Sequence, residues 1–569
     1  MISRYFKTVW IAIIVICMAL TGCSKEQPGE SEKMSGGTEV VKQTPGKDKN
    51  GGDMEKNASG NDEAAKAGSL PDKYDPPIEL STVMFNFNYP KFDEGDDLNN
   101  NRWTRHIEEQ FGIKVDTWWD VPSGQYQQKT NLMIASGKIP DFFAVTPTQF
   151  KQLYEADLIE DLTDVYRDYV TDKTRAVIEG AGQEVMASAT LDGKLMAIPW
   201  SGLVKEQVPV IWIRKDWMEK LDMSPPTTMD DVLAISEAFT TKDPDGNSKD
   251  DTFGLGMYKE LGYLFTGFVN AHHAYKGIWI EKNGKLAYSS IQPEMKTALE
   301  QMQKLYQSGQ IDPEYGVKTN EKFREMIGEG KIGMYFGGLG DPNGFLYKVT
   351  PDIEWLPFAV PSIDNEPAKL QHGLNIFNYY WVVKKGTKHP EALFKLTDMW
   401  LYYFYETMSQ QEYEEYVAVD RLGYWMSAPM KIYRPIRADD TTAIIKVLNG
   451  ELSVDQLAMR PKGTYEKIVK FMEGDMSQWS HRWQFGPDSS GAIAIQYDEN
   501  NQYKPDQFIT TPTPAMVKKK PTLEKLEDEM IHKIMQGASL DEFDEFVAKW
   551  KKLGGDEITE EVNEWYESQ

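Results

Sequence analysis

The chain has two cysteines, Cys17 and Cys23, and both lie within its first 23 residues. Everything after Cys23 therefore has to fold without a disulfide, and it has no thiolate nucleophile and no cysteine-ligated zinc or iron–sulfur site. Its stability must come from buried apolar surface. The composition supplies that surface, since 40% of the 569 residues are hydrophobic and 12% are aromatic. At about 100–200 residues per domain, the length suffices for two or three domains with large cores.

The charge of the chain argues against one broad class of function. It has 62 basic and 88 acidic side chains, a formal net charge of −26, whereas binding to a phosphate backbone needs clustered lysine and arginine. We therefore expect no nucleic-acid partner. The seven histidines show no H-E-x-x-H spacing, and the sequence contains no G-x-S-x-G elbow and no Walker A motif.

Residues 1–22 have the pattern of a secretory signal peptide. Arg4 and Lys7 precede an apolar run over residues 9–20, which is shorter than the about 20 residues that a membrane-spanning helix needs. The run leads into Leu-Thr-Gly-Cys, which resembles the lipobox of bacterial lipoproteins. That resemblance implies that Cys23 is lipidated and anchors the protein to the outer face of the cell membrane. An ordinary signal peptide with an incidental cysteine is the alternative.

Residues 23–77 differ in composition from everything that follows. They are rich in Gly, Ser, Lys, Glu, Asn and Asp, and Tyr74 is their only aromatic residue. Because such a segment has too little apolar surface to form a core, we expect a flexible linker between the lipid anchor and the folded part of the chain.

From residue 78 onward the pattern alternates between strands and helices. The sequence predicts strands at residues 78–87, 113–118 and 141–145, with helices at 101–111 and 126–136 between them. This alternation is typical of an α/β fold with a mainly parallel sheet.

Six segments resemble, in the same order, motifs of the family 1 extracellular solute-binding proteins. They are Ala135–Phe143, Leu191–Pro199, Trp212–Asp231, Gly330–Met334, Val383–Ala392 and Gly554–Tyr566. The third reads WIRKDWMEKLDMSPPTTMDD, against WxRKDWLxKLGxxxPxTxDE in the family, and the last is similar to the C-terminus of the large lipoprotein branch. The matches cover nearly all of residues 78–569.

The resemblance implies a two-lobed type II periplasmic-binding-protein fold. We expect residues 78–200 and 374–425 in the N-terminal lobe, and residues 201–373 and 426–569 in the C-terminal lobe. In this family a ligand, usually an oligosaccharide, is captured in the cleft by hinge closure and delivered to the permease of an ABC importer. The chain is thus expected to be a monomeric, extracytoplasmic binding protein that touches the membrane only through its lipid anchor, and not an enzyme.

Sugar sites stack the apolar faces of a sugar on aromatic rings and bind its hydroxyls with planar polar side chains. The resemblance implies where the cleft lies, and residue type selects the candidates beside it. The candidate ligand contacts are Asn86, Asn88, Trp118, Trp119, Asp120, Trp200, Tyr335, Phe336, Asp341 and Trp425.

The segment that begins at Asp243 has the ligand spacing of an EF-hand-like calcium loop. Its oxygen donors at positions 1, 3, 5, 7 (a carbonyl) and 9 are Asp243, Asp245, Asn247, Lys249 and Asp251. We expect a structural Ca²⁺ that relieves the repulsion among the carboxylates. Ser248 at position 6 and Gly254 at position 12 depart from the motif, and the alternative is a Pro-Asp-Gly turn with solvated carboxylates.

Two other functions stay open at this point. A protein of the same fold that binds a peptide or an anionic uronate would need cations in the cleft, for which Arg434 and Arg437 are candidates. A secreted polysaccharide-degrading enzyme would need a carboxylate pair, and 88 acidic side chains offer many. The family motifs and the lack of a distinctive catalytic constellation favour a binding protein.

Overall fold

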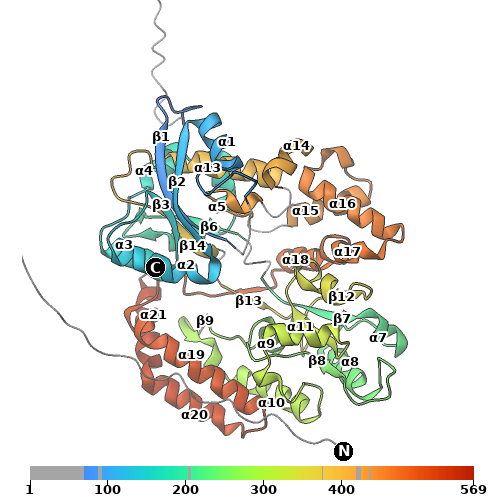
Figure 1. Cartoon of the computed structure of the whole chain (residues 1–569). Coiled ribbons are helices and arrows are strands. Elements are labelled where there is room, and N and C mark those ends of the chain that lie inside the picture. Colours follow the sequence, from blue (N-terminus) through green and yellow to red (C-terminus); the bar gives the residue numbers. More distant parts are fainter. Residues whose placement is uncertain are drawn as a thin grey trace, which may run out of the picture. The chain divides into compact units, whose positions relative to one another are not determined.

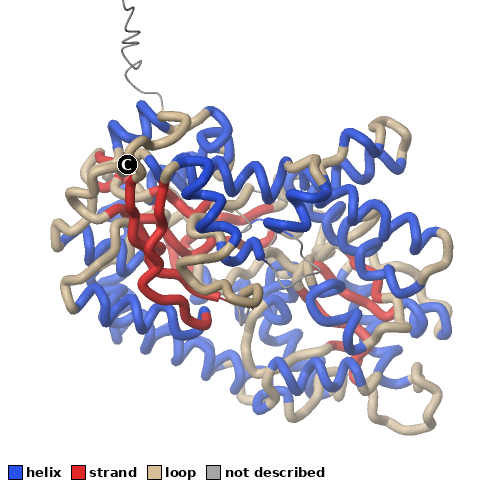
Figure 2. Tube along the Cα trace, turned by 45° about the horizontal axis from the view of Figure 1, so that its top comes forward, coloured by secondary structure: helices blue, strands red, loops and turns tan. Residues whose placement is uncertain are grey.

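The computed structural model describes residues 70–86, 92–202, 205, 207–373, 376–417, 424–434 and 438–568 (Figure 1). Cys23, the predicted signal peptide and most of the predicted linker lie outside these ranges. Residues 65–569 form one compact unit, whose strands gather in two groups covered by helices (Figure 2). No helix in the described ranges is both long and apolar enough to span a membrane.

The first hydrophobic core, here the first core, is built from residues 74–200 and 380–433. Its strands are β1 (Ile78–Asn86), β2 (Ile113–Pro122), β3 (Phe142–Val145), β4 (Thr190–Leu191), β5 (Lys194–Leu195), β6 (Ile198–Ser201) and β14 (Ile376–Val383). Its helices are α1 (Arg102–Phe111), α2 (Ser123–Ala135), α3 (Pro147–Glu155), α4 (Thr163–Tyr169), α5 (Asp172–Glu179), α6 (Gln183–Ser188), α13 (Ala392–Leu401) and α14 (Gln410–Glu412).

The strands of the first core combine both directions. β1 and β2 are parallel, with Ile78 opposite Ile113, and α1 connects them. β14 lies between β3 and β6 and runs antiparallel to both. The predicted mainly parallel sheet is therefore wrong for these three strands, because β14 returns from the second core and inserts in the opposite direction.

The second hydrophobic core, here the second core, is built from residues 208–370 and 479–562. The strands of this half are β7 (Val210–Arg214), β8 (Phe253–Leu255), β9 (Trp279–Lys282), β10 (Lys285–Tyr288), β11 (Ile332–Gly337), β12 (Trp355–Phe358), β13 (Leu370–His372) and β15 (Tyr503–Pro505). Helices α7 (Lys215–Lys220), α8 (Met229–Thr241), α9 (Tyr263–Ala271), α10 (Pro293–Gln307), α11 (Asn320–Gly328) and α12 (Tyr347–Val349) alternate with them. The remaining helices are α15 (Ala438–Leu448), α16 (Met459–Met472), α17 (Trp479–Phe485), α18 (Ser490–Glu499), α19 (Pro514–Met535), α20 (Asp541–Trp550) and α21 (Asp556–Glu567).

A four-stranded sheet in the order β12–β7–β11–β8 forms the centre of the second core. β11 is antiparallel to β7 and parallel to β8, and all six of its residues are buried. α9 packs on β11, and the C-terminal helices cover the β9–β10 hairpin, where the Tyr288 ring stacks on Trp550 at a centroid distance of 4.8 Å.

The first core extends past two of the expected boundaries. Tyr74, assigned to the linker from the sequence, is 8% exposed and donates its hydroxyl to Glu391 at 3.1 Å. Met430 and Ile432 are fully buried in the same core, although the sequence assigned them to the other lobe. Both corrections have the same cause. Tyr74, Met430 and Ile432 are isolated apolar residues in polar or irregular segments, and the sequence does not show that these segments pack on the first core.

The chain leaves the first core at Ser201, where it is bound tightly to a distant segment. The Tyr433 N–H donates to the Ser201 carbonyl at 2.9 Å, and the Ser201 hydroxyl donates to the Tyr433 carbonyl at 3.1 Å. Gly202 follows with φ +101°, and a Cβ atom there would lie 2.4 Å from the Tyr433 carbonyl oxygen. The two backbones therefore approach too closely for a side chain at position 202.

We expect Gly202→Ala to lower the free energy of unfolding by about 2–4 kcal/mol, because it adds both backbone strain and a clash with the Tyr433 carbonyl. Gly193→Ala is the matched control: its φ is +75°, but no atom lies within 4 Å of the new Cβ, so only about 1 kcal/mol of strain is expected. Urea unfolding measures both, and equal losses would contradict the close approach at Gly202.

Candidate functional site

Segments of the first core that are far apart in the sequence meet around a small cavity, here the aromatic cavity. β1, β6 and the segment 424–433 supply most of its wall. Its lining residues are Val83, Met84, Phe85, Tyr126, Ala144, Trp200, Trp381, Trp425, Met426, Pro429, Lys431 and Tyr433. Its volume of about 20 Å³ holds water and not a sugar ring, so the cavity marks where the aromatic walls converge and not the full extent of a ligand site.

Two of the predicted aromatic contacts, Trp200 and Trp425, lie in this wall. Trp200 is 2% exposed and stacks on Trp381, with centroids 4.9 Å apart and ring planes at 26°. Trp425 is half-buried and lies 5.7 Å from the Phe404 ring. The structure therefore brings both indoles to one cavity, and their contact with a ligand stays a prediction.

Asn86 and Asp120 meet in a second pocket that shares Met84, Met426 and Pro429 with the aromatic cavity. The Asn86 side-chain amide donates to Asp120 Oδ2 at 2.6 Å. Asp120 Oδ1 is buried and accepts no hydrogen bond from the described residues. Burial raises the pKa of Asp120, while the Asn86 hydrogen bond and the nearby Lys431 oppose that rise. A ligand hydroxyl would satisfy this acceptor.

Lys431 places an amine inside the aromatic wall, and the sequence analysis did not select it. The side chain is buried and donates to the Ala428 carbonyl. Burial lowers its pKa to about 7, and the charge of Asp120 acts in the opposite direction. The sequence gives one indication that Lys431 is buried, namely its position between the apolar residues Met430 and Ile432.

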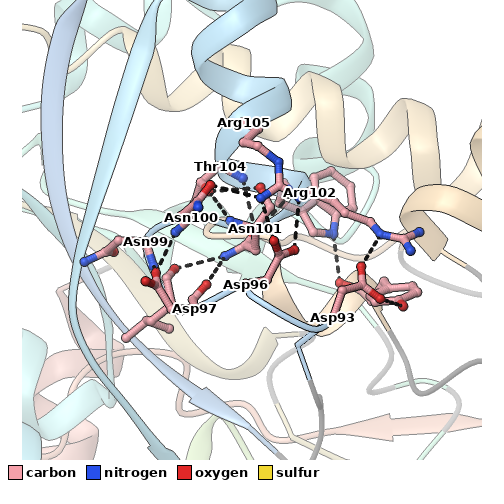
Figure 3. Close-up of polar contacts among 12 residues, drawn as sticks. Asp93, Asp96, Asp97, Asn99, Asn100, Asn101, Arg102, Thr104 and Arg105 are labelled. Carbon is pink, nitrogen blue, oxygen red and sulfur yellow. Dashed lines mark hydrogen bonds and ion pairs between the residues drawn. The ribbon is translucent and has the colours of Figure 1, made fainter.

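The segment 424–427 contributes Trp425, Met426 and Ser427 to the walls of the two pockets. The loop that precedes α1 holds this segment, and Figure 3 shows the polar contacts of that loop. Asp93 accepts hydrogen bonds from Arg102 Nε and from the Tyr424 hydroxyl, both at 2.6 Å. The Arg102 guanidinium also lies 4.2 Å from the centre of the Tyr424 ring. The Asn101 side chain caps α1 by accepting from the Trp103 and Thr104 N–H groups. The cap thus positions Arg102, and through it the wall of the cavity.

Two further predicted contacts, Trp118 and Trp119, do not line these pockets. Trp118 is 43% exposed. Trp119 packs against Tyr126 at 5.7 Å, with the Lys129 ammonium 4.5 Å from its ring centre. Neither indole lines the aromatic cavity or the adjoining pocket. Asn88 lies outside the described residues.

In the second core, the predicted contacts Tyr335, Phe336 and Asp341 differ in burial. Phe336 is fully buried and packs against Phe268, and Tyr335 is 2% exposed. Both rings are enclosed because β11 is a central strand with both faces covered, and their contact with a ligand stays a prediction. The Tyr335 hydroxyl instead donates to Asp341 Oδ2 at 3.1 Å, and Asp341 is half-buried at the surface.

The predicted calcium loop is held by hydrogen bonds between its own side chains and backbone. Asp243 accepts from the Gly246 and Ser248 N–H groups at 3.0 and 3.1 Å. The Asn247 side-chain amide bridges Asp245 and Asp251 at 2.6 and 3.0 Å, and the Asn247 side-chain oxygen accepts from the Lys249 N–H at 2.8 Å. In the described part of the chain, no group of three or more His, Cys, Asp or Glu side chains is placed to hold a metal ion.

The donor set of this loop nevertheless fits a hard cation, because all of its potential ligands are oxygens. A bidentate carboxylate at position 12 is ruled out by packing, since a Cβ at Gly254 would lie 2.0 Å from the Ser236 carbonyl oxygen. Occupancy by calcium stays a prediction.

Comparison with known proteins places this chain in a family. Residues 99–401 match the family described as bacterial extracellular solute-binding protein. The chain is 26% identical over 244 residues to the polygalacturonan/rhamnogalacturonan-binding protein YtcQ of Bacillus subtilis, covering 42% of this chain and 47% of YtcQ. It is 27% identical over 237 residues to the lipoprotein LipO of the same organism, covering 40% and 45%. The chain thus matches just under half the length of these relatives.

A solved structure is similar in fold over most of the chain. The substrate-binding protein FusA of S. pneumoniae, in complex with kestose, superposes with a TM-score of 0.59 at 17% identity, covering 86% of this chain and 99% of FusA. At this identity the likeness concerns the fold alone.

We expect the free energy of unfolding to rise between about pH 7 and pH 10. Lys431 should contribute about 3 kcal/mol to that rise. In that interval an unfolded lysine, with an ordinary pKa near 10.4, holds a proton that the folded Lys431 has released. Lys431→Met should remove this rise, whereas Lys385→Met, at an exposed ion pair, should keep it. Urea titrations at several pH values measure the difference, and parallel curves for all three proteins would contradict the assignment.

Proposed function

Because the chain belongs to the family of bacterial extracellular solute-binding proteins, we propose that it captures an oligosaccharide outside the cytoplasm and delivers it to the permease of an ABC importer. The observation that carries the proposal is the convergence of Trp200, Trp425, Asn86 and Asp120 on adjoining pockets. Indole rings match the apolar faces of sugars, and Asp120 offers a buried acceptor that has no partner among the described residues.

The relatives support this assignment by what they bind. YtcQ is named for polygalacturonan and rhamnogalacturonan, and FusA is a fructooligosaccharide transporter protein. We propose that this chain likewise binds its ligand without converting it, and that it acts as a monomer. Cys23, after removal of residues 1–22, would carry the lipid that holds the protein at the membrane.

An anionic uronate is a second candidate ligand, favoured by Lys431 in the cavity wall. Burial removes the water that would stabilise the charged form of this amine, and a ligand carboxylate would stabilise that form instead. Arg434, the earlier candidate, already pairs with Glu406 at 3.1 Å and with Asp439 at 3.3 Å, and Arg437 lies outside the described residues.

We expect the purified chain to unfold at a higher temperature with one of four trisaccharides: kestose, maltotriose, galactotriose or tri-galacturonate. A ligand at 100 times its Kd stabilises by about 2.7 kcal/mol, which shifts the Tm by a few degrees. Trp425→Ala should weaken the binding about tenfold, whereas Trp565→Ala, whose ring packs on Phe508, should leave it unchanged. Thermal shift and titration calorimetry measure both; cleavage of the sugar would point to an enzyme, and a flat panel would refute this proposal.

We further propose that the loop Asp243–Asp251 binds one structural Ca²⁺. Calcium should raise the Tm by a few degrees over EDTA, because a cation joins carboxylates that otherwise repel one another. Asp251→Ala should abolish the difference, and Asp250→Ala, the neighbouring carboxylate at a non-ligand position, should retain it. Melting curves that EDTA leaves unchanged would exclude the site.

A further inference from the structure

In the second half of the chain, a partly exposed aromatic ring lies near a carboxylate that two hydrogen bonds hold in place. Tyr263, the first residue of α9, is 38% exposed, and its ring lies beside Gly338. The Gly338 N–H donates to Asp341 Oδ2 at 3.0 Å, and the Tyr335 hydroxyl donates to the same oxygen at 3.1 Å. One carboxylate oxygen is thus fixed by two donors, which sets the direction of the other.

The free side of this carboxylate points to the same place as the tyrosine ring. A Cβ at Gly338 would lie 3.4 Å from Asp341 Oδ1 and 3.3 Å from Tyr263 Cε2. Asp341 Oδ1 accepts no hydrogen bond from the residues that the structure describes, and the residue is half-buried. The ring and the spare acceptor therefore lie on either side of the position that a side chain at Gly338 would occupy, and Gly338 itself is buried.

The arrangement of Tyr263 and Asp341 depends on glycines at positions 337 and 338, which leave room for both side chains. A Cβ at Gly337 would lie 2.4 Å from Asp341 Oδ2, so a side chain there would displace the carboxylate. Gly340 leaves room beside the amide nitrogen of Gln484, which would be 3.8 Å from a Cβ at that position. Asn343 donates to the Gln484 side-chain oxygen at 2.8 Å, which orients the amide nitrogen as a further donor.

We propose that Tyr263 and Asp341 form a subsite on the second core for one neutral pyranose ring, which stacks on the tyrosine while its hydroxyls donate to Asp341 Oδ1. This inference rests on the proposed function and specifies a substrate feature within it. A sugar with uncharged hydroxyl groups fits the acceptor, whereas a uronate ring at this position would set two carboxylates against each other. Selectivity for a neutral ring follows from the charge of a single residue.

The protonation state of Asp341 gives the subsite a pH dependence. Burial raises the pKa of Asp341 to about 7, although the Tyr335 and Gly338 hydrogen bonds and the charge of Arg324 lower it. Tyr258 and Tyr263 also face this carboxylate, and both have a raised pKa, so they stay neutral near pH 7. The ionised carboxylate is the better acceptor, and we therefore expect sugar binding to strengthen as the pH rises through about 7.

The test uses the purified chain and whichever neutral trisaccharide, kestose, maltotriose or galactotriose, raises its Tm most. Tyr263→Ala should raise the Kd about tenfold, and Tyr263→Phe should stay within about threefold of wild type because it keeps the ring. Asp341→Asn should raise the Kd about tenfold at pH 8. In the Lys431→Met background, which lacks the other group with a pKa near 7, Asp341→Asn should also remove the pH dependence of the Kd. Tyr347→Ala is the control, because Tyr347 is equally exposed at 39% in the same half of the chain and is expected to have no effect.

The outcomes separate this inference from the proposed function. If a neutral sugar binds but Tyr263→Ala behaves like Tyr347→Ala, the subsite is wrong and the transport function stands. Binding of tri-galacturonate alone would likewise refute the neutral subsite. If none of the four trisaccharides binds, both the subsite and the proposed function fail.

Discussion

Three tryptophan indoles hold the segment 424–433 against the first core, and the candidate site depends on that attachment. The N–H groups of Trp103, Trp381 and Trp400 donate to the carbonyls of Tyr424, Lys431 and Ile432 at 2.8, 2.8 and 2.5 Å. No disulfide is available after Cys23, so this irregular segment is fixed by buried hydrogen bonds inside an aromatic cluster. An indole N–H that has no acceptor is unfavourable in an apolar core. These hydrogen bonds therefore favour the one arrangement of the segment in which all three indoles are paired.

The same aromatic packing determines the electrostatics of the site. Removing water raises the pKa of Asp120 and lowers that of Lys431, so two groups that would be fully charged on the surface titrate closer to neutral pH. Asp341 in the second core follows the same rule with a different cluster of rings. In each case one or two hydrogen bonds position the polar group. Each group could form a further hydrogen bond with a ligand.

The sequence was informative wherever a signal is local. The helix expected at residues 101–111 begins one residue later, because Asn101 is its cap, and ends at Phe111 before Gly112, whose φ is +64°. The first parallel strand pair was also predicted, since it is connected by that helix. Trp200 and Trp425 were selected as aromatic residues beside a cleft, and Asn86 and Asp120 as polar ones, and these four converge. The burial of Tyr335 and Phe336 was not predicted, because their residue types do not reveal that both faces of β11 are covered.

By itself, the sequence determined the α/β class, the family and the residue types of the site, since these depend on local pattern and on motif order along the chain. It did not determine the direction of β14, the limits of the first core, or the roles of Lys431 and Tyr263. These depend on which distant segments pack together: Lys431 becomes buried because segment 424–433 lies on Trp381 and Trp400, and Tyr263 lies over Asp341 because α9 packs on β11. The charge state and exposure of a side chain are set by its neighbours in space, and only the tertiary structure decides which neighbours those are.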